Sequence, residues 1–103
     1  MKLYLVKERD RMVWVAALAD EVMYSYVANT GKFHDNLALR NDFYMERHFT
    51  YTEIGSAQAQ RLIDTGLGHL DENAYTEALA EWRADPKPLD PTEVLSMAAG
   101  FNP

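Results

Sequence analysis

The residues with the greatest chemical capacity lie between positions 29 and 48, where proton carriers, amides and guanidinium groups gather between hydrophobic segments. His34 and Asp35 are adjacent there, and an imidazole near a carboxylate can act as a general acid or base close to neutral pH. Because consecutive side chains point in different directions, a productive pair would instead join His34 to Asp42 or Glu46 across the fold. The structural alternative is that His34 hydrogen-bonds to a turn while Asp35 caps a helix.

A candidate anion clamp lies in the same region. Helical periodicity over residues 36–47 would place four polar side chains along one face, namely Asn36, Arg40, Tyr44 and Arg47. Two guanidinium groups on such a face could grip a phosphate or carboxylate bidentately. The alternative is a solvated helix face on which Arg40 pairs with a neighbouring acid such as Asp35 or Glu46.

Together these groups define an enzyme hypothesis, a small enzyme or toxin that acts on a nucleotide or RNA phosphate. His34 would be the acid or base, oriented by Asp42 or Glu46, while Arg40 and Arg47 would hold the phosphate charge. No catalytic signature supports it, because Thr30-Gly31-Lys32 lacks the glycine spacing of a phosphate loop. The hypothesis requires these side chains to converge in one cleft.

The sequence predicts neither a metal site nor a cofactor. The chain contains no cysteine, which excludes disulfides, thiol catalysis and thiolate ligands. Its three histidines, His34, His48 and His69, are separated by fourteen and twenty-one residues, and this spacing matches no local ligand pattern.

The net charge of −6 belongs entirely to the second half of the chain. Residues 1–48 hold seven basic and seven acidic residues, whereas residues 49–103 hold three basic and nine acidic residues. Long-range repulsion makes nucleic acid an unfavourable partner for the acidic half, while a basic protein surface would be attracted to it. We therefore expect a protein partner.

The size and composition predict one folded domain in the cytoplasm. A length of 103 residues with 48% apolar content is enough for a hydrophobic core. No apolar run approaches the roughly 18 residues needed to cross a bilayer, and the first residues lack the apolar core and cleavage site of a secretory signal. We expect no membrane association.

Three short strands are predicted in the first third of the chain, over residues 3–7, 12–18 and 22–28, with charged turns between them. The tight connections indicate an antiparallel meander, and the strand at 12–18 is apolar on both sides, which favours a central position. In the third strand Tyr24 and Tyr26 share one face, so we expect that strand to cover the core with one side only. A fourth strand is predicted over residues 49–54.

A polar helix is predicted over residues 36–47, although its apolar residues also alternate and would fit a strand. Beyond residue 55, helical patterns dominate. Ser56 can cap a helix that ends before Gly66, which suits a left-handed C-cap. The clearest pattern places Tyr75, Ala78, Leu79 and Trp82 at i, i+3, i+4 and i+7 behind the cap candidate Asp71, and it predicts a buried Trp82.

The prolines in Asp85-Pro86-Lys87-Pro88-Leu89 end that helix, so we place the boundary of the α+β domain at residue 84 and a C-terminal tail over 85–103. Asp90 fits the N-cap of a short amphipathic helix with Pro91 at its first position. A helix of this length needs packing to be stable. Its apolar residues Val94, Leu95 and Phe101 must therefore contact either their own domain or a partner groove.

The predicted fold is α+β, with an antiparallel sheet of three or four strands and two or three helices packed mainly on one face. The function that the sequence favours is a noncatalytic interaction or regulatory protein, in the manner of an inhibitor or antitoxin subunit that covers a basic partner surface. Its partner contacts would be Tyr24 and Tyr26 on the sheet, because tyrosine is enriched at interfaces, and the apolar tail residues. A homodimer contact through the same aromatic face is the related alternative.

Overall fold

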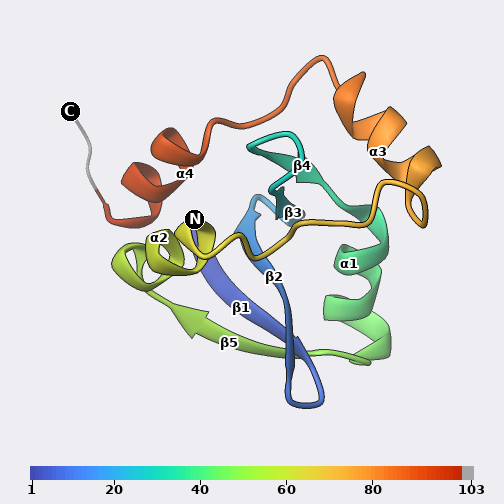
Figure 1. Cartoon of the computed structure of the whole chain (residues 1–103). Helices are drawn as coiled ribbons and strands as arrows, with labels where there is room; N and C mark the ends of the chain where they lie inside the picture. The colour runs from blue at the N-terminus through green and yellow to red at the C-terminus, as the bar shows by residue number, and fades with distance from the viewer. Residues whose placement is uncertain (101–103) are drawn as a thin grey trace.

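The computed structural model describes residues 1–100, which form an α+β fold around one antiparallel sheet (Figure 1). The strands are β1 (Lys2–Glu8), β2 (Arg11–Ala19), β3 (Val22–Val27), β4 (Lys32–Asp35) and β5 (Thr50–Ile54), in the spatial order β4-β3-β2-β1-β5. The α-helices are α1 (Leu37–Asn41), α2 (Ser56–Asp64), α3 (Thr76–Arg83) and α4 (Pro91–Ala98), and a π-helical turn, η1 (Asp42–Glu46), continues α1. The predicted class is confirmed, but the described residues contain five strands and four α-helices rather than three or four strands and two or three helices.

The strand absent from the prediction is β4, which we expected to be part of a turn and a helix cap. Gly31, at φ +70°, lets the chain reverse directly after β3. Residues 32–35 then pair with β3, and the register includes Tyr26 opposite Phe33. With only four residues, this strand is too short to show an alternating pattern in the sequence.

Helices cover both faces of the sheet, which corrects the expectation of helices mainly on one face. One core cluster joins Leu3, Val15 and Phe33 to residues of α2 and α4. The other joins Val6, Trp14 and Met23 on the opposite face to Leu39 of α1 and Leu79 of α3. Figure 1 shows the same division, with α2 and α4 on one side of the sheet and α1 and α3 on the other.

This two-sided cover explains the central position of β2, as its apolar sequence predicted. Its residues 14–17 are all buried, since every side chain of a strand covered on both faces must be apolar or paired. The same cover corrects the expectation for β3: Tyr26 lies in one cluster, whereas Met23 and Val27 lie in the other.

Local signals set the ends of the helices. After α2, the amide of Leu67 donates to the carbonyl of Leu62 and that of Gly66 donates to Ile63, a Schellman closure that Gly66 allows at φ +89°. Asp90 caps α4 as predicted, because its Oδ1 accepts from the amide of Thr92 at 2.8 Å. The predicted cap Ser56 instead donates its hydroxyl to the carbonyl of Leu95.

Residues 84–90 connect α3 to α4 around the outer edge of β4, and we call them the strap. Phe33 and Leu89 exchange main-chain hydrogen bonds of 2.9 and 2.8 Å, and Lys32 forms an ion pair with Asp90. Beyond the strap, Val94 and Leu95 are buried in the core. The described part of the C-terminal segment therefore packs on the chain's own sheet, while Phe101 lies outside the described residues.

The loop after α2 returns to β3 through a close main-chain approach at Gly68. The amide of Ala28 donates to the carbonyl of Gly68 at 3.1 Å, and the side chain of Asn29 binds both the amide and the carbonyl of Leu70. A Cβ atom at Gly68 would lie 2.3 Å from the carbonyl oxygen of Tyr26, so only glycine fits there.

We predict that Gly68→Ala lowers the free energy of unfolding by about 2–4 kcal/mol, because left-handed strain adds to a clash with main chain. Gly66→Ala is the matched control, since Gly66 has a similar φ but open space around it, and it should cost only about 1 kcal/mol. Chemical denaturation of both variants measures the difference. Equal losses would contradict the close approach at Gly68.

Candidate functional site

The sheet places His34 in the interior of the protein, with both ring nitrogens bound. Its side chain is 2% exposed. Nδ1 lies 2.9 Å from Oδ2 of Asp85, and Nε2 lies 2.7 Å from Oγ1 of Thr30. Because an ionised carboxylate can only accept, Nδ1 carries a proton and donates it. The ring also stacks on Trp82, with 6.1 Å between the ring centroids.

Thr30, His34 and Asp85 place a hydroxyl, an imidazole and a carboxylate in the same order as nucleophilic hydrolases do. Their contacts nevertheless show that they join the turn to the strap. The hydroxyl of Thr30 is held in its turn, 3.1 Å from the carbonyl of Val27 and 3.2 Å from the amide of Lys32. Burial leaves no free nitrogen on His34 for a substrate. The hydrogen bond to Thr30 is the turn contact that the structural alternative expected of His34. The bond to Asp85 of the strap is an additional contact.

Asp85 is the carboxylate partner of His34, rather than Asp42 or Glu46. The amide of Lys87 donates to Oδ1 of Asp85 at 2.9 Å. This amide, followed in effect by the hydrogen bond from His34, keeps the pKa of Asp85 below its usual value although burial acts in the opposite direction. The carboxylate therefore stays ionised beside the imidazole.

Asp42 lies in a second buried polar cluster, which η1 and β5 build together. The π-helical turn closes with the amide of Arg47 on the carbonyl of Asp42, and Arg47 then adopts a left-handed conformation. The reversed chain directs the amides of His48 and Phe49 at the carboxylate of Asp42, at 2.8 and 3.1 Å. The Tyr51 hydroxyl donates to the same carboxylate at 2.7 Å.

The pKa values of this cluster follow from these bonds. Burial alone would raise the pKa of Asp42, but the Tyr51 hydroxyl and the two amides outweigh it and lower that pKa. Burial, and then the adjacent Asp42 carboxylate, raise the pKa of Tyr51. A buried carboxylate that accepts three hydrogen bonds, one on Oδ1 and two on Oδ2, stabilises the turn.

Arg40 and Arg47, the two residues expected to hold a phosphate, contact different parts of the protein. The Nε of Arg40 donates to the carbonyl of Glu21, and its guanidinium lies 5.5 Å from the ring centre of Tyr44. The Arg47 guanidinium lies over the ring of Phe43 at 4.7 Å. Helix α1 is capped by Asn36, whose side chain accepts from the amide of Leu39, and not by Asp35.

The predicted catalytic residues thus fall into separate clusters. Among residues 1–100, no hydrogen bond or ion pair joins His34 to Arg40, Asp42 or Arg47. Within the described residues, Asp42 and Arg47 are joined by a main-chain hydrogen bond, which closes the π-helical turn.

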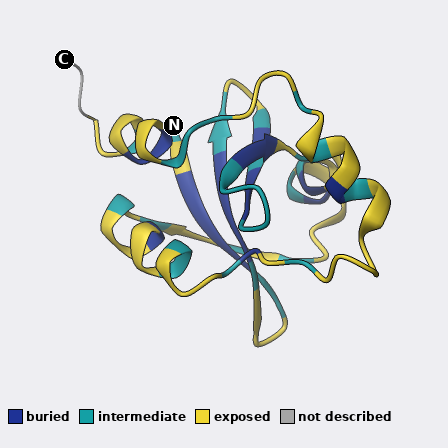
Figure 2. Cartoon of the chain, turned by 45° about the horizontal axis from the view of Figure 1, so that its top comes forward, coloured by how far each residue is buried: buried dark blue, intermediate teal, exposed yellow. Residues whose placement is uncertain are grey.

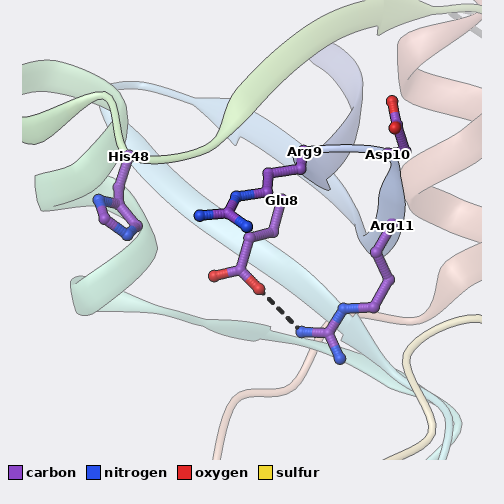
Figure 3. A pocket seen from close by; sticks show the side chains of 5 residues that line it. All are labelled: Glu8, Arg9, Asp10, Arg11 and His48. Carbon is purple, nitrogen blue, oxygen red and sulfur yellow. Dashed lines mark hydrogen bonds and ion pairs between the residues drawn. The ribbon is translucent and has the colours of Figure 1, made fainter.

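An open hollow beside the β1–β2 turn collects charges of both signs (Figure 3). It is lined by Glu8, Arg9, Asp10, Arg11 and His48. Arg11 is paired with Glu8 at 3.0 Å, and the Arg9 side chain reaches across the hollow toward His48. Two acids beside two arginines leave little net field, so this hollow is a weak site for an ionic ligand.

The predicted partner contacts are mostly inside the molecule. Tyr26, Val94 and Leu95 are buried, and Tyr24 is half-buried. Burial, with Asp35 as the next contributor, raises the pKa of Tyr24. These side chains stabilise the core and leave little of the proposed aromatic and tail surface free.

The exposed acids concentrate around α3. Glu72 binds Arg83 through two hydrogen bonds of 2.9 and 2.7 Å, and these contacts, followed by the one from Asn29, lower the pKa of Glu72 to about 2. Glu77 and Glu81 form no ion pair with any described residue. Both are exposed and lie one turn apart on α3, and we call them the acidic face. The ribbon of this region is coloured mostly as exposed in Figure 2.

Comparisons with protein-family models, curated proteins and solved structures gave no match for this chain. Within residues 1–100, no group of three or more His, Cys, Asp or Glu side chains is arranged to hold a metal ion. No described helix is both long and apolar enough to span a membrane.

The partners of the two buried clusters were not predicted from the sequence: Thr30 and Asp85 around His34, and Tyr51 around Asp42. Thr30 stands four residues before His34, a spacing that could have suggested a turn contact. Asp85 lies 51 residues away from His34, and no local pattern connects them. Burial of a polar side chain is the only signal that demands such partners.

We predict that Asp42→Asn lowers the free energy of unfolding by about 2–3 kcal/mol at pH 7, since the new amide group would place a donor among three donors. The pKa of Asp42 is depressed in the folded state, so its contribution is present above the ordinary carboxyl pKa. That contribution is lost as the pH falls through the folded-state value. The variant should therefore show a shallower loss of stability below about pH 4.

Denaturant unfolding from pH 7 to pH 2 measures this difference. Glu77→Gln, on the exposed side of α3, is the control and should follow the wild type. An unchanged acid limb in Asp42→Asn would contradict the role given to the Asp42 carboxylate.

Proposed function

We propose that this protein is a noncatalytic interaction or regulatory protein that binds a basic protein surface through the outer side of α3. The single observation that carries the proposal is the concentration of exposed charge there. Residues 71–83 hold four exposed acids (Asp71, Glu72, Glu77 and Glu81) against Arg83, which gives −3 of the chain's −6.

The construction of α3 supports a docking role. Leu79 is fully buried and attaches the helix to the sheet, while the double hydrogen bond between Glu72 and Arg83 ties the preceding loop to its last turn. The acidic face is thus presented on a fixed support, so little entropy is lost when a partner binds. Tyr75, 49% exposed at the start of the helix, adds the aromatic contact that interfaces favour.

The charge narrows the class of partner. A surface rich in Arg and Lys, such as a phosphate-binding or nucleic-acid-binding site on another protein, would be attracted over a distance. The association rate would fall as the salt concentration rises, because salt screens the attraction. An inhibitor or antitoxin-like subunit that covers such a site is the concrete form of the proposal. The catalytic alternative has less support, because His34 and Asp42 are fully engaged inside the protein.

The test compares two double variants with the same net charge. Glu77→Lys/Glu81→Lys reverses the acidic face, and Asp10→Lys/Asp64→Lys reverses two exposed acids elsewhere. Each substitution adds two charges, so both variants change from −6 to −2. Tagged wild type and both variants are used to isolate companions from the native host, and the affinity for a purified companion is then measured at several salt concentrations.

We expect a companion with a basic contact surface that binds the wild type and the control similarly. The acidic-face variant should lose affinity at least about tenfold, as removal of charge complementarity does at other interfaces. Equal losses in the two variants would show that net charge alone matters. A companion without a basic surface would overturn the proposal.

A further inference from the structure

The two edge strands of the sheet differ in whether their outer main-chain groups are hydrogen-bonded. On the β4 side, the strap supplies Leu89, which exchanges two main-chain hydrogen bonds with Phe33. On the other side, β5 pairs only with β1. Among residues 1–100, no further main-chain hydrogen bond reaches Thr50–Ile54. The outer side of β5 therefore leaves donors and acceptors open to solvent.

The open edge lacks several of the features by which proteins prevent strands from pairing, although Glu53 places one charge on it. It contains no proline, lysine or glycine between residues 50 and 54, and its register with β1 is unbroken from Leu3 opposite Ile54 to Lys7 opposite Thr50. Thr50, Thr52 and Glu53 are exposed. A regular edge of β-branched and aromatic residues with one charge is a template for another strand.

We propose that β5 pairs with β5 of a second copy of this chain, antiparallel and about a two-fold axis at Thr52, so that two sheets join into one. This interface is separate from the acidic face on α3 and does not depend on the function proposed for it.

The charge of the strand favours this register over one centred on Glu53, and an axis at Thr52 pairs all five residues of β5. A two-fold axis perpendicular to the sheet keeps each face of one copy continuous with the same face of the other, so residues of one face oppose each other. With the axis at Thr52, Thr52 opposes itself, Tyr51 opposes Glu53 of the second copy and Thr50 opposes Ile54. The single charge of the strand never faces its own kind. An axis at Glu53, or parallel pairing, would bring the two carboxylates together.

The size and charge of this contact set its expected strength. Pairing of five residues supplies about four to six main-chain hydrogen bonds. A contact of this size falls below the roughly 1,200 Å² of a stable interface unless neighbouring elements contribute. Two copies of charge −6 also repel each other, so we expect a dimer that forms with rising concentration and becomes stronger as salt screens the repulsion.

A single-cysteine variant tests the register directly, because the natural chain contains no cysteine. At the proposed axis, Thr52→Cys places two thiols on directly opposed residues, whose Cβ atoms are about 4.5–5.5 Å apart in such pairs. Mild oxidation or a short bismaleimide should convert most of the protein to a covalent dimer. Ser96→Cys, equally exposed but on α4, is the matched control and should remain mostly monomeric.

A second variant tests the dimer without a cross-link. Thr52→Lys places two ammonium groups against each other at the axis and should abolish the concentration-dependent dimer that sedimentation detects in the wild type, with an unchanged circular dichroism spectrum. Ser96→Lys should dimerise like the wild type.

The proposal is overturned by a wild type that stays monomeric to millimolar concentration in high salt. A dimer that survives in Thr52→Lys, or equal cross-linking of Ser96→Cys and Thr52→Cys, would also overturn it.

Discussion

The contact between β4 and the strap is the constraint on which the rest of the structure depends. Within a few residues, Lys32 pairs with Asp90 at 3.2 Å, Phe33 exchanges main-chain hydrogen bonds with Leu89, and His34 binds Asp85. Because the strap rounds the sheet edge here, α3 is held on one face and α4 on the other. The same contact covers the β4 edge of the sheet, whereas the β5 edge has no such cover among the described residues.

The parts of the fold that the sequence could predict are those with a local cause. Asp90 followed by Pro91 specifies the start of α4 within four residues, and Gly66 specifies the end of α2 through its positive φ. The central position of β2 followed from a run of apolar residues, which only a strand buried on both faces can carry. In each case the residues that decide the structure are neighbours in the chain.

The parts that the sequence could not predict depend on contacts between distant residues. β4 exists because β3 on one side and Leu89 on the other complete its hydrogen bonds, and four residues alone carry no strand pattern. The π-helical turn is stabilised by Tyr51 and by two amides that arrive after the chain has reversed. Trp82, predicted as buried, is half-buried at the border of the core, where it packs against Trp14 and His34.

Burial explains why the chemically most capable residues are the least suited to catalysis here. A buried polar side chain that lacks hydrogen-bond partners destabilises the fold. His34 finds its partners in Thr30 and Asp85, and Asp42 finds its partners in the amides of His48 and Phe49 and the hydroxyl of Tyr51. Every bond that fixes these groups removes a lone pair or proton that a substrate would need. Clusters whose hydrogen bonds are formed in this way specify one arrangement of the main chain. In this protein the reactive side chains of His34 and Asp42 therefore hold separate segments together in the interior. The carboxylates of Glu77 and Glu81 on α3 and the outer main chain of β5 have no such partners within residues 1–100, and they are the surfaces for which we propose binding.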